Sequence, residues 1–527
     1  ARFSNGGRIS ILIQPIFAAD WHRHNLGRPR MRSKSLMMRN STRSGHPSVS
    51  RAILPSTALR SVMASALGPV FRPLLRPALR PVLGLAMVLT VSLAGPPAKA
   101  ETLFEALASA YASNPTLQAA RASVRTTDEG VPEALGGWRP TVSLSGTAGL
   151  QRSKTTGTTE QDLLPQTYSA DVSQSLYAGG RTIASVKQAE SDVQVARAQL
   201  TVTEQSVLLD GITAFLDVLR DQARVQLTKN NEVVLRRQLE ATKDRFEVGE
   251  VTRTDVAQAE ARLSGTVAVR VGAEGDLAEA RASYRQVFGV MPGTLQPAPP
   301  LPNFPANEGE ALAVAEAENP TLAVALNNET TARHAVEEAK GLLLPSVDLA
   351  GRLRRTDETS LEDTSTNSGS LNATVSIPLY QAGAVHAQVR QAKELLNQRR
   401  IEVEESRRDI IEAASQAWER LTTTQSQISA RSEEIRANEI ALEGVRQEAE
   451  VGSRTTLDVL DAEQELLNSR VALVIAERDE YVAGYFLLAA IGRLTAVNIG
   501  LPVQIYDPDQ HYQKVRNKWW GWKTEKD

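Results

Sequence analysis

Apolar and polar residues alternate with period two in four short stretches of the chain. In the first stretch, Val142 and Leu144 alternate with Ser143 and Ser145. This period is typical of strands that have one apolar face and one polar face. The predicted strands cover about residues 140–151, 167–177, 345–355 and 370–379. The segments joining each pair are rich in Thr, Ser, Asp and Glu, as is typical of solvent-facing loops.

Two proline-free stretches, residues 181–247 and 384–450, instead place apolar residues at every seventh position. These residues are Val186, Val193, Leu200, Val207 and Ala214 in the first stretch, and Val389, Leu396, Val403, Ile410 and Ala417 in the second. A heptad repeat predicts long helices that pack as coiled coils. Each helix would extend roughly 100 Å at 1.5 Å per residue, which exceeds any globular core.

Each long helix is expected to turn back at a glycine, Gly249 in the first case and Gly452 in the second. Glycine readily adopts the left-handed conformation that ends many helices. The return helices and two further helices are predicted over about residues 252–289, 455–492, 102–135 and 308–344.

The order of these elements occurs twice, and short motifs recur with it. Asn114-Pro115 recurs as Asn319-Pro320, and Glu247-Val248-Gly249 recurs as Glu450-Val451-Gly452. The chain after residue 100 is therefore predicted to contain two similar halves. We assign a first repeat, a proline-rich connector, a second repeat and a C-terminal tail to residues 101–291, 292–307, 308–498 and 499–527.

The N-terminal residues differ from the rest in charge. The whole chain has a formal net charge of −2, but residues 1–100 contain only one acidic residue, Asp20, among many basic ones. Arginines precede an apolar run from Val82 to Ala94, and Ala98-Lys99-Ala100 follows it. This order is typical of a secretory signal peptide, which we predict over residues 63–100. Residues 1–62 are interpreted as an unstructured leader or a mis-assigned start.

Candidate catalytic chemistry is sparse. The chain has no cysteine, which excludes thiol catalysis, disulfides and cysteine-ligated zinc. The histidines after residue 100, at 334, 386 and 511, have no ligand spacing, and no Gly-rich phosphate loop or nucleophile elbow is present. We therefore expect neither an enzyme nor a bound metal or cofactor.

The strands predict either an ordinary antiparallel sheet packed on helices or part of a membrane β-barrel. Strands of about ten residues with one apolar face, after a signal peptide, match outer-membrane barrels. Four strands cannot close a barrel, which needs about eight, and open edges would leave backbone groups unpaired in lipid. Three copies of the chain would supply twelve strands. The predicted fold class is thus mainly α, with duplicated halves, each contributing two barrel strands and long coiled-coil helices.

Several motifs resemble the TolC family of outer-membrane channel-tunnels, the outer membrane efflux proteins. The resemblance is carried by Ser175–Gly180 (SLYAGG), Pro378–Gly383 (PLYQAG) and Val451–Ala462 (VGSRTTLDVLDA), in duplicated order. It implies a homotrimer whose twelve-stranded barrel lies in outer-membrane lipid and continues as an α-helical tunnel through the periplasm. It also implies a passive duct that docks with a periplasmic adaptor (membrane fusion) protein and an inner-membrane ABC or RND-type transporter.

The resemblance also implies roles for residues at the periplasmic entrance. By motif position, Asp458 and Asp461 match an aspartate ring, and Arg454 and Asp255 match a latch that holds the entrance closed. Arg253 could substitute in this latch, because the family's latch tyrosine is absent here. Our hypothesis is that neutralising Arg454 and Asp255 together opens the entrance and changes single-channel conductance.

A local structural role is open for the same aspartates. Thr252 and Thr455 can cap the return helices, with Asp255 and Asp458 completing capping boxes. Asp461 has no such local role, so the entrance prediction depends mainly on it and on the resemblance.

The tail, residues 499–527, interleaves basic residues with Trp519, Trp520 and Trp522. It resembles the tails of family members that serve type I protein secretion, and we expect it to pack around the tunnel's midsection. Nucleic-acid binding is not expected of an exported protein. The predicted function is the exit duct of a type I secretion system. The alternatives are a multidrug or small-solute efflux duct and, in a different class, a periplasmic coiled-coil adaptor or structural protein.

Overall fold

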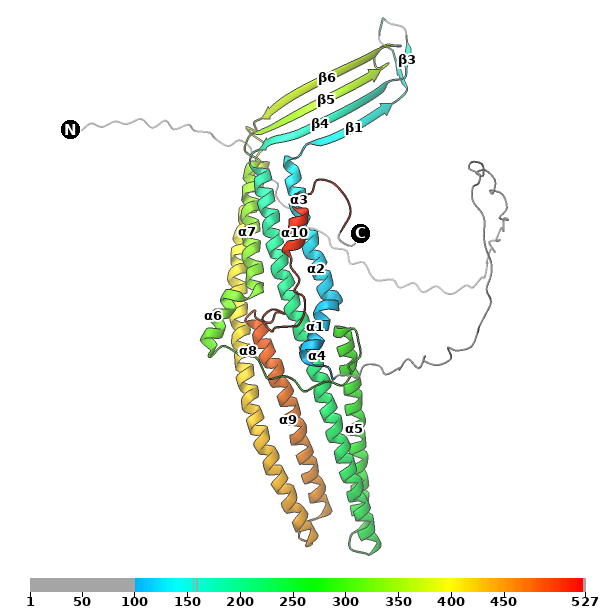
Figure 1. Cartoon of the computed structure of the whole chain (residues 1–527), viewed down its shortest axis with the longest axis vertical. Helices are drawn as coiled ribbons and strands as arrows, with labels where there is room; N and C mark the ends of the chain where they lie inside the picture. The colour runs from blue at the N-terminus through cyan, green and yellow to red at the C-terminus, as the bar shows by residue number, and fades with distance from the viewer. Residues whose placement is uncertain (1–99, 155, 158–159, 525–527) are drawn as a thin grey trace, which may run out of the picture. The chain divides into compact units, whose positions relative to one another are not determined.

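The computed structural model describes residues 100–154, 156–157 and 160–524 (Figure 1). The predicted leader, and all of the predicted signal peptide except its last residue, lie outside the described residues. The described chain combines long helices with a four-stranded sheet and a small two-stranded sheet. Among these residues, no helix has the length and apolar content that crossing a bilayer requires.

The two longest helices each fold back into a return helix, forming two antiparallel hairpins (Figure 1). The hairpins are α4 (Arg181–Glu247) with α5 (Arg253–Phe288), and α8 (Ala384–Glu450) with α9 (Thr456–Ala490). Gly249 and Gly452 lie in the turns, each with a φ of 80°. In the first turn Gly249 N donates to Phe246 O at 3.0 Å, and the following N–H donates to Arg245 O at 2.9 Å. These bonds satisfy carbonyls that the helix end leaves free.

Both return helices begin with a capping box. Thr252 Oγ1 accepts from Asp255 N at 3.3 Å, while the Asp255 carboxylate accepts from Thr252 N at 2.7 Å. Thr455 and Asp458 make the same pair of bonds, at 3.3 and 2.9 Å. The exchange satisfies two N–H groups at the start of each helix.

The shorter helices are broken where the sequence pattern predicted continuous ones. The stretch predicted as one helix over 102–135 forms α1 (Leu103–Ser113), α2 (Pro115–Asp128) and α3 (Gly130–Leu135), followed by a 3₁₀ turn, η1 (Gly136–Trp138). The stretch predicted over 308–344 forms α6 (Glu308–Glu318) and α7 (Pro320–Gly341). A short helix, α10 (Asp509–Val515), lies in the tail.

The first break in each half falls at an asparagine followed by proline. Proline lacks an N–H and disfavours helical backbone at the preceding residue, so α1 ends just before Asn114 and α6 ends just before Asn319. The asparagine side chains then cap the next helices, because Asn114 Oδ1 accepts from Thr116 N at 2.9 Å and Asn319 Oδ1 accepts from Thr321 N at 2.8 Å.

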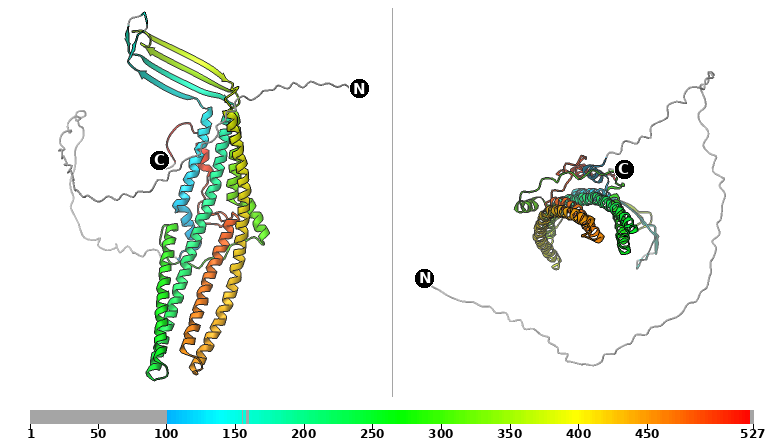
Figure 2. Two further views of the ribbon diagram at one scale, coloured as in Figure 1. Left: turned by 180° about the vertical axis from the view of Figure 1, so that it is seen from behind. Right: turned by 90° about the horizontal axis from the view of Figure 1, so that it is seen from below.

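The helices form a curved layer, seen from below in the right-hand view of Figure 2. Far from the sheet, α8, α9, α4 and α5 follow one another across the layer; near the sheet, α7 and α2 replace the return helices. The main core lies where these two levels meet, and it contains Leu107, Phe215, Tyr284 and Leu487. The layer is thus one helix thick and has α8 at one edge and α2 and α5 at the other.

The four-stranded sheet is antiparallel, with the order β1-β4-β5-β6. Its strands are β1 (Thr141–Ala148), β4 (Gln166–Ala178), β5 (Ser346–Asp357) and β6 (Ser365–Ser376). Pairing of β4 with β5 therefore joins the two halves of the duplication.

Part of the first loop, predicted only as a polar, solvent-facing segment, contains a small hairpin. Its strands are β2 (Gln151–Ser153) and β3 (Gln161–Leu163). Arg152 Nε donates to Asp162 Oδ1 at 2.6 Å across this hairpin. The segment is polar and has no period-two pattern, so the sequence did not predict these strands; the pair of opposite charges supports their register.

Candidate channel surface

The four-stranded sheet has one apolar face. The register places Val142 opposite Val172, Ala170 opposite Leu353, and Val347 opposite Val375. Because side chains alternate between faces along each strand, these pairs share a face. Large apolar side chains on it are open in the single chain, with exposed fractions of 82% for Leu144 and 74% for Leu371.

The opposite face of the sheet is polar and internally bonded. Thr141 and Ser173 share a hydroxyl hydrogen bond of 2.7 Å, and Ser145 and Ser169 share one of 2.8 Å. Asp171 pairs with Arg352 across β4 and β5. The sheet therefore has an apolar and a polar side, as the period-two pattern predicted.

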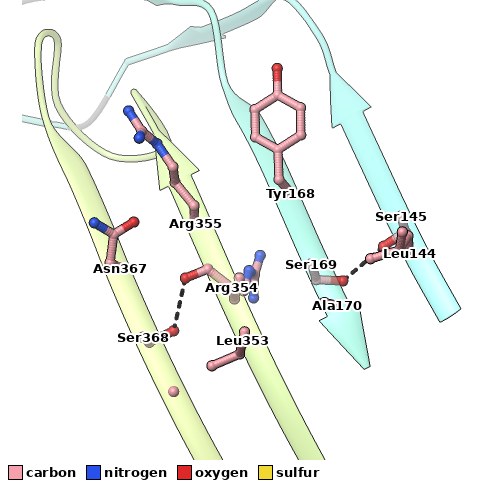
Figure 3. Close-up of a pocket in the computed structure, with 11 residues that line it drawn as sticks. Leu144, Ser145, Tyr168, Ser169, Ala170, Leu353, Arg354, Arg355, Asn367 and Ser368 are labelled. Atoms are coloured by element: carbon pink, nitrogen blue, oxygen red, sulfur yellow. Dashed lines mark hydrogen bonds between the residues drawn. The ribbon is translucent and has the colours of Figure 1, made fainter. Parts of the chain in front are cut away.

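A hollow of about 590 Å³ lies against the middle of the sheet (Figure 3). Its lining includes Leu144, Tyr168 and Leu353, together with Ser145, Ser169 and the Arg354 backbone. The dashed bonds in Figure 3 join Ser145 to Ser169, and Ser368 Oγ to the carbonyl oxygen of Arg354. The hollow is a shallow, open depression of the sheet surface.

The sheet and the helical layer both have two free edges in the single chain. Within the part of the chain that the structure describes, β1 and β6 each pair on one side only. The edge helices also carry exposed apolar side chains, including Ile401 and Ile440 on α8 and Val269 and Val271 on α5. Figure 1 shows β6 above α8 and β1 above α3 and α2, so each free edge continues from sheet to helices.

The predicted entrance residues lie at the tips of the hairpins, far along the helices from the sheet. Asp458 accepts hydrogen bonds from the backbone N–H and the hydroxyl of Thr455, and these bonds hold the pKa of its carboxyl below the usual value. Asp255 makes the equivalent bonds to Thr252. Both carboxylates are thus engaged in helix capping.

The predicted latch residues Arg454 and Asp255 are not paired with each other in the single chain. Arg454 Nε instead donates to Glu448 Oε2 at 2.9 Å, within its own hairpin. Arg253 is exposed, and it makes no side-chain hydrogen bond or ion pair within the described residues. Asp255 is held by its capping box, so its oxygens are directed at Thr252.

A different pair connects the hairpins near their tips. Arg262 of α5 donates to Asp461 of α9. Beside this pair, Leu235 and Ala259 of the first hairpin pack with Leu460 of the second, and all three are buried. Asp461 was predicted at the entrance, but Arg262 was missed, because no local motif reveals which helix lies opposite.

A second cross-hairpin link lies closer to the main core. Arg478 Nε of α9 donates to Asp217 Oδ1 of α4 at 2.9 Å. Asp217 also accepts from Arg220, whose guanidinium pairs with the buried Asp221. These links tie the hairpins together along their length.

Comparison with known proteins decides the family. A family model described as outer membrane efflux protein matches residues 106–290 and 311–493, one match in each half. The chain belongs to the outer membrane efflux protein family. It is 37% identical over 433 residues to the outer membrane efflux protein BepC of Brucella suis, covering 82% of this chain and 94% of that protein. It is also 27% identical to the outer membrane protein TolC of Vibrio cholerae, covering 77% of this chain and 94% of that protein.

Solved structures agree with this assignment at the level of the fold. The outer-membrane channel OprN is 20% identical, with a TM-score of 0.65 and coverage of 74% of this chain and 89% of that chain. The outer membrane protein VceC from Vibrio cholerae is 18% identical, with a TM-score of 0.65 and coverage of 74% and 96%. This efflux protein therefore has the mainly helical, duplicated fold of the channel-tunnels, belongs in the outer membrane, and is of a family of channels rather than enzymes.

Proposed function

We propose that three copies of this chain close a twelve-stranded barrel in the outer membrane, and that their helices continue it as a periplasmic tunnel. The exit duct so formed is passive and docks with a periplasmic adaptor protein and an inner-membrane transporter of the ABC or RND type. The apolar face of the sheet is directed at lipid, and the polar face lines the pore.

The main support for this proposal is that the single chain has two free edges, each formed by an edge strand and the helices below it. An unpaired edge strand exposes N–H and C=O groups, and lipid offers them no hydrogen-bonding partner. The edge of β1 with α2 and α5 differs from the edge of β6 with α8. When one edge of each chain binds the unlike edge of the next, the contact repeats around an axis and can close into a ring. Three copies with four strands each supply twelve strands, which is enough to close a barrel.

Engineered cysteines test the ring directly, because the chain has no native cysteine. One cysteine replaces Ser145 on β1, and a second is scanned along β6 from Ser365 to Ser376. We expect one register to give a closed covalent trimer on oxidation. The matched control places the cysteines at Ser169 and Arg354, which already face each other in one chain and should cross-link only within it. Ladders of open polymers, or no cross-link at any position, would contradict the proposal.

We further propose that the six carboxylates of Asp458 and Asp461 form the narrow entrance of the trimer, and that Arg262 with Asp461 replaces the predicted latch. A ring of carboxylates attracts cations and repels anions. Planar-bilayer recordings should therefore show cation preference that falls when Asp461 is neutralised. Arg454, Asp255 and Arg253 remain candidates for contacts between neighbouring copies.

Type I protein secretion is the first candidate for the transported class. Relatives include the proteases secretion protein PrtF of Dickeya chrysanthemi, which is 27% identical over 280 residues. The tail also resembles those of secretion components. Deleting the gene should remove a specific protein from the culture medium, and expression of the full chain should restore it.

Small-solute efflux is the second candidate, because the relative with 37% identity is described as an efflux protein. Deletion should then lower the minimal inhibitory concentration of several unrelated toxic compounds. An unchanged set of secreted proteins together with this sensitivity would favour efflux over secretion.

A further inference from the structure

We propose that the C-terminal tryptophans of each chain anchor the duct in the periplasmic leaflet of the outer membrane, by inserting among anionic phospholipid headgroups. This inference rests on the proposed function in one respect, since it takes the sheet to span that membrane. The surface concerned, here called the tail anchor, consists of Lys518, Trp519, Trp520, Trp522 and Lys523.

The tail runs toward the sheet, parallel to the first helices of the chain. Tyr506 N donates to the hydroxyl of Tyr111 in α1 at 3.2 Å. Farther along, His511 Nδ1 lies 3.0 Å from Oδ2 of Asp128, a fully buried residue at the end of α2. Later tail residues thus meet later residues of the segment that leads up to β1.

Ion pairs hold the tail against α4 on the way. Asp509 forms an ion pair with Arg197, in which Oδ1 lies 2.7 Å from Nη2, and Arg516 Nη2 donates to Glu190 Oε1 at 2.9 Å. Both partners belong to the half of α4 that is nearer the sheet. These bonds fix the last helix, α10, and so determine where the following residues must emerge.

Those residues emerge at the base of the sheet. Arg139 lies two positions before β1 begins, and its Nη1 donates to Lys518 O at 2.8 Å. Its guanidinium also lies 4.9 Å from the centre of a Trp519 ring. Figure 1 and the left-hand view of Figure 2 both show the C-terminal segment beside α3, just below the sheet.

The three indoles are open where they emerge. The exposed fractions are 62% for Trp519, 87% for Trp520 and 93% for Trp522. Clustered exposure of large apolar side chains marks an interaction surface, and indoles favour the boundary between lipid and water because one end is apolar and the N–H is polar. The right-hand view of Figure 2 places the tail with the first helices on the convex side of the layer, away from the concave side.

The basic residues beside the tryptophans favour an anionic lipid surface over a purely apolar surface as the partner of the tail anchor. Beyond Arg516, which is paired with Glu190, residues 517–527 contain Lys518, Lys523 and Lys526 against Glu525 and Asp527, so the side chains of this segment have a formal net charge of +1. Basic side chains beside an anionic membrane surface strengthen its binding. Because the helices and the tail lie on the same side of the sheet, the headgroups that the tail anchor can reach belong to the periplasmic leaflet.

The anchor is tested with a nitroxide at Thr524→Cys, in the full-length trimer reconstituted into vesicles of phosphatidylethanolamine and phosphatidylglycerol. The accessibility of the nitroxide to lipid-soluble oxygen and to a water-soluble nickel reagent reports its depth. We expect headgroup depth in the native tail, and loss of that depth in the variant Trp520→Ser with Trp522→Ser. A label at Ser453→Cys, on a hairpin tip, should be water-accessible throughout.

Matched variants separate the tail anchor from general effects. Val497→Ser removes another exposed apolar side chain farther from the sheet and should leave the label depth unchanged. Replacing phosphatidylglycerol by phosphatidylcholine, or Lys518 and Lys523 by glutamine, should move the label toward water. Equal depth in both lipid mixtures would overturn the assignment to anionic headgroups.

Three outcomes overturn the anchor as a whole: a native label as water-accessible as the tip label, a label shielded from both reagents by a neighbouring copy, or unchanged depth without the two tryptophans. Single-channel conductance of the same vesicles distinguishes the two proposals. Conductance with a water-exposed tail rejects the anchor alone, whereas absence of conductance rejects the duct.

Discussion

The two helical hairpins have the same backbone plan and different surroundings. Leu208, Ile212 and Phe215 of α4 are fully buried, because α4 lies inside the layer and contacts helices on both sides. The corresponding α8 residues, Ile411, Ser415 and Trp418, are only partly buried. α8 lies at the edge of the layer, with long helices on one side only and the short helix α6 as its further contact. Duplication thus preserved the residues that shape each hairpin, while position in the layer decided how much of each helix is covered.

The tips differ in charge as well. Arg454 and Glu448 form an ion pair in the second hairpin, whereas Val251 and Arg245 occupy the corresponding positions in the first. Asp461, which reaches across to Arg262, corresponds to Gln258. The turn and capping residues recur, but the charged contacts do not. The two tips therefore share the same turn and capping geometry but differ in the charges on their surfaces.

The largest expected effect concerns burial. Phe215→Ala removes a fully buried ring from the main core and should lower the free energy of unfolding by about 3–5 kcal/mol. Trp418→Ala, at the corresponding position of α8, should cost clearly less in the unassembled chain, since that ring packs only partly against the core. Denaturant unfolding followed by circular dichroism measures both. Equal losses in the unassembled chain would contradict the contrast between the two helices.

The next effect concerns the shared turns. Gly249→Val and Gly452→Val force a β-branched side chain into left-handed backbone and should each destabilise the protein by about 1–2 kcal/mol. Gly444→Ala is the matched control, because Gly444 is helical and a methyl group there meets open space. It should stabilise α8 by up to about 1 kcal/mol. Thermal unfolding distinguishes the destabilisation expected for the turn variants from the stabilisation expected for Gly444→Ala. A valine at either turn that leaves the melting temperature unchanged would contradict the role given to these glycines.

A smaller effect on stability, with a clear effect on transport, is expected for the link between tips. Arg262→Gln and Asp461→Asn each break an exposed pair, which is worth about 0–1 kcal/mol. Both should raise single-channel conductance, but only Asp461→Asn should lower cation preference. Glu448→Gln breaks the pair with Arg454 inside one tip and should leave conductance unchanged. Identical conductance and cation preference in all three variants would contradict the different roles given to the Arg262–Asp461 and Arg454–Glu448 pairs.

The smallest effect concerns Glu204, a partly buried residue of α4 whose counterpart in α8 is Arg407. Burial raises the pKa of Glu204, although its carboxylate accepts from Ala496 N at 2.7 Å. Its folded pKa is above the unfolded value, so its protonation stabilises the fold fully at low pH, and that contribution is lost as pH rises through the folded pKa. Glu204→Gln should remove this contribution to the pH dependence of the free energy of unfolding, at pH values just above the ordinary pKa of glutamate. Unfolding measured across that range, with wild type beside the variant, checks the sign.

Local signals explain which parts of this fold were predictable. The heptad repeats indicated long coiled-coil helices, and the turn glycines have the positive φ that ends such helices. Asn114-Pro115 and Asn319-Pro320 were recognised as recurring motifs, yet the helix breaks they impose were overlooked, although proline chemistry signals them. The β2–β3 hairpin was missed because its strands are short and polar and have no period-two apolar pattern; Arg152 and Asp162 pair across it.

The period of each segment, the glycine turns and the capping boxes follow from local sequence, because each depends on residues within a few positions of one another. Long-range packing instead pairs β4 with β5 across the two halves, brings Arg262 rather than Arg454 to the other hairpin, and places Trp519 against Arg139 below the sheet. These contacts join residues far apart in the chain. Their partners follow from how long helices lie side by side, and no short motif encodes that arrangement.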